Sequence, residues 1–196
     1  MKLVTFDQGR VGRVEGDEIV ELAVHTMQEY FGTVGAAETG RVFRLDEVTL
    51  QAPIIPRKLI HTAGNFREHE EESKRVDWSH EIAPWIVAPE EVPDPHDLRM
   101  ELRVNGELRQ ESHSSRMSVT IPEILSHYSA LGYSAGDVVS TGTVSGVAGF
   151  SEDAASLYLR PGDVMEAEIE RIGVLRNPVI SWQEAHGEAA PLRERS

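Results

Sequence analysis

The clearest pattern along the chain is a pair of segments that flank one tight turn. Apolar residues alternate with charged ones over residues 99–104, and Asn105-Gly106 follows before residues 107–110. Strict alternation places the apolar side chains on one face of a strand. Asn-Gly accepts the positive φ angles of a two-residue hairpin loop. The pattern therefore predicts a β-hairpin over residues 99–110.

This hairpin contains a candidate binding residue. With a two-residue loop, Val104 faces Glu107 and Leu102 faces Arg109, so Arg109 projects from the apolar face unless a β-bulge intervenes. A guanidinium on an apolar face requires a carboxylate partner or a bound ligand. Arg109 is therefore a candidate substrate-binding residue, and a salt bridge at the rim of the sheet is the alternative.

A second alternating segment, residues 164–170, has apolar residues on one face and three glutamates on the other. Similar Gly-Asp turns precede this segment and the apolar pair Val138-Val139, which predicts two turn-to-strand units. Residues 121–128 favour a helix with Thr120 as its N-cap. We expect an α+β fold that is mostly β, built on an antiparallel or mixed β barrel or roll.

The N-terminal 55 residues have the pattern of a separate small domain. Pro53 and Pro56 interrupt any regular element and mark the predicted boundary. Residues 56–180 then form the main domain, and residues 181–196 form a polar tail that is expected to fray. Within the small domain the pattern predicts strands over residues 4–6, 11–14, 19–22 and 48–50 and a short helix over residues 26–31.

Composition and charge narrow the class of protein. The 196 residues include 19 Lys and Arg against 33 Asp and Glu, giving a net charge of −14. A field of this sign repels phosphate, which disfavours nucleic acid as a partner. No segment resembles a membrane span or a signal peptide, and the chain has no cysteine. A cytoplasmic protein with no membrane partner is expected.

Two further segments could carry chemistry. His69 and Glu72 lie three residues apart on a helix predicted over residues 65–72, so their side chains share a face. A carboxylate beside an imidazole raises its basicity, as a general base requires, although a surface salt bridge is the simpler alternative. Residues 141–147 form a loop rich in glycine and hydroxyl groups that could present donors to an oxyanion, or could be a glycine bend in a strand.

Several motifs in order resemble the fumarylacetoacetate hydrolase family. Residues 63–72 resemble its G-x-N-Y-x-x-H-x-x-E segment, and the remaining motifs are Pro84-Trp85-Ile86-Val87, residues 94–98, 104–110, 121–124 and 136–143, and Gly162-Asp163-Val164. The resemblance covers residues 58–180. It implies a mixed β roll preceded by a small N-terminal domain, and an enzyme that cleaves or rearranges 1,3-dicarbonyl compounds and keto acids.

The resemblance also implies roles for individual residues. His69 and Glu72 match the catalytic dyad that activates water or shuttles protons, and Thr143 matches the threonine that holds a substrate carboxylate or carbonyl oxygen. Asn65 matches a position adjacent to the metal site. Val144 replaces the proline common after that threonine, which alters the expected loop.

One expected segment is missing. Family members carry, between the H-x-x-E helix and the P-W-I-V strand, three carboxylates that bind Mg²⁺ or Mn²⁺. Only residues 73–83 separate Glu72 from Pro84 here, and none match those carboxylates, so no metal ligand is assigned. We interpret this as an internal deletion that leaves the β roll incomplete.

Two functions fit the sequence. One is a metal-dependent hydrolase, isomerase or decarboxylase of a small keto-acid substrate, in a chain that forms a homodimer as the family implies. The other is a catalytically silent remnant that serves as a dimerising or interaction module.

Overall fold

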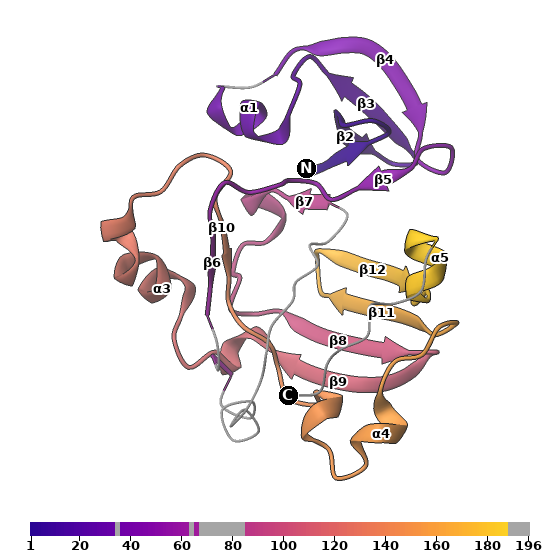
Figure 1. The fold of residues 1–196 in the computed structure, drawn as a ribbon. Coiled ribbons are helices and arrows are strands. Elements are labelled where there is room, and N and C mark those ends of the chain that lie inside the picture. The colour runs from indigo at the N-terminus through magenta and orange to yellow at the C-terminus, as the bar shows by residue number, and fades with distance from the viewer. Residues whose placement is uncertain (34–35, 63–64, 67–84, 188–196) are drawn as a thin grey trace.

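The computed structural model describes residues 1–33, 36–62, 65–66 and 85–187 (Figure 1). Within that part of the chain the strands form three sheets. A six-stranded sheet is built mainly from N-terminal residues, a two-stranded sheet joins two short strands, and a four-stranded sheet contains the predicted hairpin. Helices are short and few, so the predicted mostly-β fold is confirmed.

The N-terminal sheet is an antiparallel meander with one added strand from later in the chain. Its members are β1 Lys2–Phe6, β2 Arg10–Glu15, β3 Glu18–Leu22, β4 Glu38–Arg44, β5 Leu50–Gln51 and β7 Trp85–Val87. The order is β4-β3-β2-β1-β5, and β7 also pairs with β1.

The strands of this sheet agree with the predicted ones except in two places. The first three predicted strands are confirmed as β1, β2 and β3, whereas the fourth is shifted, since β5 begins only at Leu50. β4 was missed, because its residues are mostly exposed and polar and show no alternation.

The predicted N-terminal helix is present as α1 (Met27–Gly32). The Thr26 hydroxyl accepts a hydrogen bond from the Glu29 amide at 3.1 Å, and the Glu29 carboxylate accepts from the His25 amide at 2.7 Å. Two backbone donors that a helix start leaves unpaired are thereby satisfied. The reciprocal bond reaches one residue further back than the usual capping box.

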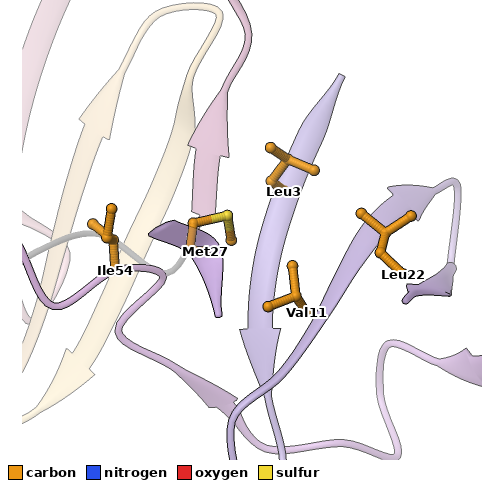
Figure 2. Close-up of a cluster of buried hydrophobic side chains, with 5 residues drawn as sticks. All are labelled: Leu3, Val11, Leu22, Met27 and Ile54. Atoms are coloured by element: carbon orange, nitrogen blue, oxygen red, sulfur yellow. The ribbon is translucent and has the colours of Figure 1, made fainter. Parts of the chain in front are cut away.

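The core lies on the two faces of this sheet. Figure 2 shows one cluster, to which α1 and the segment after β5 contribute, and Ile86 and Val138 pack against it. Val4, Phe6 and Ile19 form the second cluster on the other face. Because the first cluster takes side chains from later segments, burial of apolar area ties the meander to the rest of the molecule. The residues drawn in Figure 2 are Leu3, Val11, Leu22, Met27 and Ile54.

The four-stranded sheet contains the predicted hairpin, β8 (Arg99–Val104) and β9 (Glu107–His113). Val104 pairs with Glu107 as expected, but Leu102 pairs with Gln110, and the register shifts between Leu102 and Arg103. The predicted pairing of Leu102 with Arg109 is therefore wrong. A β-bulge makes Arg109 the extra residue of β9. A bulge was the one condition under which the predicted pairing would not hold, and the sequence alone does not reveal it.

The other half of this sheet is β11 (Val164–Ile169) and β12 (Gly173–Pro178), and the strand order is β12-β11-β8-β9. The described strands β9 and β12 are its two edges, and Val104 is the buried apolar residue that the sheet supplies to the core. No closed barrel forms among the described residues. The sheet is thus an open, thinly covered layer, in agreement with the predicted incomplete roll.

The remaining elements connect these sheets. β6 (Leu59–His61) pairs in parallel with β10 (Val138–Ser140), and α3 (Ile121–His127) begins with the predicted capping box of Thr120 and Glu123. α4 (Ala154–Leu157) lies beside β9 in Figure 1. Short 3-10 turns cover Pro89–Glu91, Ser114–Arg116, Ser129–Leu131 and Ala148–Phe150.

The start of the polar tail differs from its prediction. Trp182–His186 form helix α5, and the Ser181 hydroxyl accepts from the Glu184 amide at 3.1 Å while the Glu184 carboxylate accepts from the Ser181 amide at 2.7 Å. This capping box satisfies the exposed helix start, so the described beginning of the tail has regular structure. Among the described helices, none is both long and apolar enough to cross a membrane.

The two Gly-Asp turns have the same local structure. Asp137 Oδ2 accepts from the Ser134 amide at 2.8 Å, and Asp163 Oδ2 accepts from the Arg160 amide at 2.7 Å. Each aspartate closes the turn that leads into its strand, as short polar side chains commonly do. The predicted turn-to-strand units are therefore confirmed.

Asp137 gives the fold a testable acid sensitivity. The hydrogen bond from the Lys58 ammonium, 2.9 Å from Oδ2, is the main cause that lowers the pKa of Asp137. A carboxylate with a lowered folded-state pKa contributes stability above its unfolded value of about 4, and loses it as the pH falls through the folded-state pKa. As the pH falls below about 4, we expect the free energy of unfolding to decrease less in Asp137→Asn than in the parent protein. Urea denaturation at a series of pH values measures this difference.

Asp17→Asn is the matched control, since Asp17 lies exposed in a turn. The control is expected to keep the acid sensitivity of the parent protein. An identical pH profile for Asp137→Asn and the parent would contradict the role given to the pair with Lys58.

Candidate functional site

A cavity of about 640 Å³ is lined by residues of the four-stranded sheet and of the segment that contains α4. Apolar side chains of β8 and β11 line one side, and residues 143–159 line the other. The volume is within the range of small-molecule sites. Its apolar lining residues include Leu102, Val104, Met165, Phe150, Leu157 and Leu159.

Arg109 and Thr143, the two predicted substrate-binding residues, both line this cavity. Arg109 lines the cavity although it is the extra residue of the β9 bulge and does not pair with Leu102. Arg109 Nη2 lies 3.1 Å from Glu107 Oε2, so the salt bridge considered from the sequence is also present. Arg109 Nε is buried and has no hydrogen-bond partner among the described residues.

Gln110 holds the loop of residues 141–147, here called the threonine loop, against β9. Its side-chain Nε2 donates to the Val144 carbonyl at 3.1 Å and the Ser145 carbonyl at 2.9 Å. Sequence reasoning did not identify this residue, because its role depends on the bulge that places Gln110 opposite Leu102. The loop that carries Thr143 is thus fixed by side-chain contacts from the neighbouring strand.

Gly146 allows the same loop to approach β9 closely. It has a φ angle of +92°, and a Cβ atom at this position would lie 2.6 Å from the Arg109 carbonyl oxygen. Glycine is therefore required both by the backbone conformation and by the available space. Gly146 in this glycine-rich loop therefore permits the close contact between the loop and β9.

Asn65 connects the segment after β6 to two other segments. Its side chain is buried, and Nδ2 donates to the Val119 carbonyl at 2.9 Å and the Thr141 carbonyl at 3.0 Å. Its Oδ1 accepts from the Val119 amide at 2.8 Å. The position beside Thr141 brings Asn65 to the start of the loop that carries Thr143.

The predicted catalytic dyad falls in a part of the chain without described structure. His69 and Glu72 lie outside the described residues, as does most of the helix predicted over residues 65–72. Of the other predicted site residues, Arg109 and Thr143 line one cavity, and Asn65 contacts the start of the loop that carries Thr143 without being among the residues that line this cavity.

The described residues do not fit a divalent cation. They contain no group of three or more His, Asp or Glu side chains close enough to share a metal ion. The most buried carboxylate of the sheet, Glu101, is paired with Arg99 and with Arg103, whose Nη2 lies 2.7 Å away. Glu101 and Arg103 lie on the face of the sheet that is opposite the cavity. On that face they line a smaller pocket together with Glu166 and Glu168.

Comparison with known proteins identifies the chain. Residues 47–180 match the model of the fumarylacetoacetate (FAA) hydrolase C-terminal family, and residues 1–53 match the Rv2993c-like N-terminal family. The chain belongs to the fumarylacetoacetate hydrolase family. The resemblance found in its motifs is thereby confirmed.

Curated relatives in this family have several activities. A 2,4-didehydro-3-deoxy-L-rhamnonate hydrolase of Sphingomonas sp. (strain SKA58) is 39% identical over 103 residues, which is 52% of this chain and 36% of that protein. Oxaloacetate tautomerase YisK of Bacillus subtilis is 38% identical over 108 residues, 54% of this chain and 35% of the relative. The matched stretch spans about a third of each of these relatives.

Solved structures of the family share the fold. Maleylpyruvate hydrolase from Sphingobium sp. SYK-6, in complex with manganese(II) and pyruvate, aligns with a TM-score of 0.72 at 22% identity, covering 92% of this chain and 99% of that one. Fumarylacetoacetate hydrolase from Exiguobacterium antarcticum aligns with a TM-score of 0.71 at 21% identity and the same coverages. These likenesses establish the fold.

Proposed function

We propose that the chain binds a small keto acid and acts as a hydrolase, isomerase or decarboxylase of that substrate. The observation that carries the proposal is the single cavity that both Arg109 and Thr143 line. Relatives named as a maleylpyruvate hydrolase and an oxaloacetate tautomerase act on compounds of this class. Turnover assays distinguish the three reaction types.

The described residues supply binding and orientation. Arg109 lines the cavity, and a substrate carboxylate would accept from its Nη2 in place of the exposed Glu107 carboxylate. The Thr143 hydroxyl would donate to a second substrate oxygen. His69, oriented by Glu72, is proposed to move the proton at the reacting carbon.

The family fold implies Mg²⁺ or Mn²⁺, which polarises the oxygens of a dicarbonyl substrate. Since the described residues hold no ligand set for it, no step is assigned to the cation.

We further propose that the chain works in the cytoplasm and forms a homodimer.

Turnover of oxaloacetate and of an acylpyruvate, assayed with Mn²⁺, with Mg²⁺ and with EDTA, tests the proposed function. We expect Thr143→Val to raise KM about tenfold, since it removes one hydrogen bond to a charged or polarised oxygen. Thr143→Ser keeps the hydroxyl and is expected to stay near the parent value. Absence of turnover under every condition would contradict the proposal and favour a catalytically silent remnant.

A further inference from the structure

The tip of the β8–β9 hairpin carries the one asparagine of the chain that precedes a glycine. The other two asparagines precede Phe66 and Pro178, and no aspartate of the chain precedes a glycine. Asn105 and Gly106 are both exposed, so water reaches them. Because glycine has no side chain, nothing hinders its backbone nitrogen from approaching the neighbouring amide group. Asn105 is therefore the asparagine of this chain that is most prone to react with its own backbone.

The reaction of such a pair is deamidation, one cause of the thermal lability of asparagine. The Gly106 nitrogen attacks Cγ of Asn105 and forms a new N–C bond, while the bond from Cγ to Nδ2 breaks. Nδ2 leaves as ammonia and takes the proton of the Gly106 amide. Water then opens the cyclic imide at either carbonyl. The products have aspartate or isoaspartate at position 105, and isoaspartate adds one carbon to the main chain.

The native structure holds both ends of the Asn105 amide group. Nδ2 donates to Asp163 Oδ1 at 2.9 Å, and Oδ1 accepts from the Val164 amide at 2.9 Å. Attack at Cγ requires the side chain to turn toward the Gly106 nitrogen, which breaks both hydrogen bonds. The folded chain therefore resists a reaction that the unfolded chain permits.

The same contacts are lost when the residue is modified. They extend the pairing of β8 with β11 to the hairpin tip, together with a hydrogen bond from the Asn105 amide to the Val164 carbonyl at 2.9 Å. Aspartate at position 105 would replace the donor to Asp163 by a second carboxylate, and like charges repel. Isoaspartate would lengthen the two-residue loop that sets the register of the hairpin.

We infer that Asn105 is a deamidation site which the native fold protects, and that its conversion in the unfolded chain weakens the structure that can form afterwards. An episode of unfolding would thus leave a covalent change at the hairpin tip. The inference is independent of the proposed function, since neither Asn105 nor Asp163 lines the cavity.

Incubation of the full chain at neutral pH, with and without urea above the unfolding midpoint, tests the protection. Peptide mass mapping follows the conversion of Asn105, and an isoaspartyl methyltransferase detects isoaspartate. One net hydrogen bond changes a population ratio about fivefold, so two bonds predict conversion at least about 25-fold slower in the native protein than in urea. Asn65 and Asn177, which do not precede glycine, serve as internal controls and are expected to stay largely unmodified.

Two variants separate the contact from general stability. Asp163→Ala removes the acceptor of Asn105 Nδ2 and is expected to raise the native conversion rate about fivefold. Asp137→Ala is the matched control, because it removes the aspartate of the other Gly-Asp turn and its pair with Lys58. Conversion of Asn105 in this control should stay near the parent rate.

Asn105→Asp reproduces one product of the reaction. We expect its folding equilibrium constant, measured by urea denaturation, to be about tenfold lower than that of the parent protein. Slow native conversion, fast conversion in urea and acceleration confined to Asp163→Ala would support the inference. Equal conversion in the folded and unfolded parent, equal acceleration in both alanine variants, or unchanged stability of Asn105→Asp would each overturn it.

Discussion

Replacing Asn65 by leucine is expected to lower the free energy of unfolding by about 3 kcal/mol. The leucine has a similar size but neither donates nor accepts hydrogen bonds. The carbonyls of Val119 and Thr141 and the amide of Val119 would then lose their partners inside the protein. Urea denaturation measures the change, and faster hydrogen exchange at the Val119 amide locates it.

Asn65→Asp tests the two hydrogen bonds that the Asn65 amide nitrogen donates. It keeps the size and the acceptor for the Val119 amide, but it has no amide group to donate to the two carbonyls. We expect it to be at least as destabilising as Asn65→Leu at pH 7, because it also buries a charge. Unchanged stability in Asn65→Leu would show that these three segments are held together by other contacts.

Gly146→Ala is expected to destabilise the protein by about 3 kcal/mol. Part of the cost is the positive φ angle, and the rest is the contact of the new Cβ with the Arg109 carbonyl at 2.6 Å. Because that carbonyl belongs to β9, relief of the contact must displace either the strand or the threonine loop. Thermal and chemical denaturation give the magnitude of the effect.

Two other glycines separate these causes. Gly162 has a φ angle of +99° and no atom within 4 Å of the position that a Cβ would take, so Gly162→Ala should cost only about 1 kcal/mol. Gly149 has equally open space and no positive φ angle, so Gly149→Ala should change stability by less than about 0.5 kcal/mol. Equal effects at Gly146 and Gly162 would rule out the close approach of loop and strand.

Much of the local structure followed from the order of residues alone. The helix starts at Thr26 and Thr120, the hairpin at Asn105-Gly106 and the Gly-Asp turns were predicted because each depends on neighbours within a few positions. β4 was missed, because its polar residues join the sheet through backbone hydrogen bonds to β3 that leave no pattern in the side chains.

The site was predictable only in part. Arg109 and Thr143 were singled out from the hairpin pattern and from the family resemblance, and the structure places both on one cavity. Gln110 was not, since its bonds to the carbonyls of Val144 and Ser145 arise from a bulge. One extra residue reverses which side chain meets the partner strand, and no local signal in residues 107–110 specifies it.

The sequence by itself determined the family, the mostly-β class, the helix caps and the tight turns, because these depend on motif order and on contacts between near neighbours. Tertiary structure alone decided that Asn65 joins Val119 to Thr141, that Gln110 fixes the threonine loop, and that Arg109 Nε is left without a partner among the described residues. The bonds of Asn65 and Gln110 join residues that are far apart in the chain. Their geometry depends on how whole strands pack, which the spacing of residues along the chain does not specify.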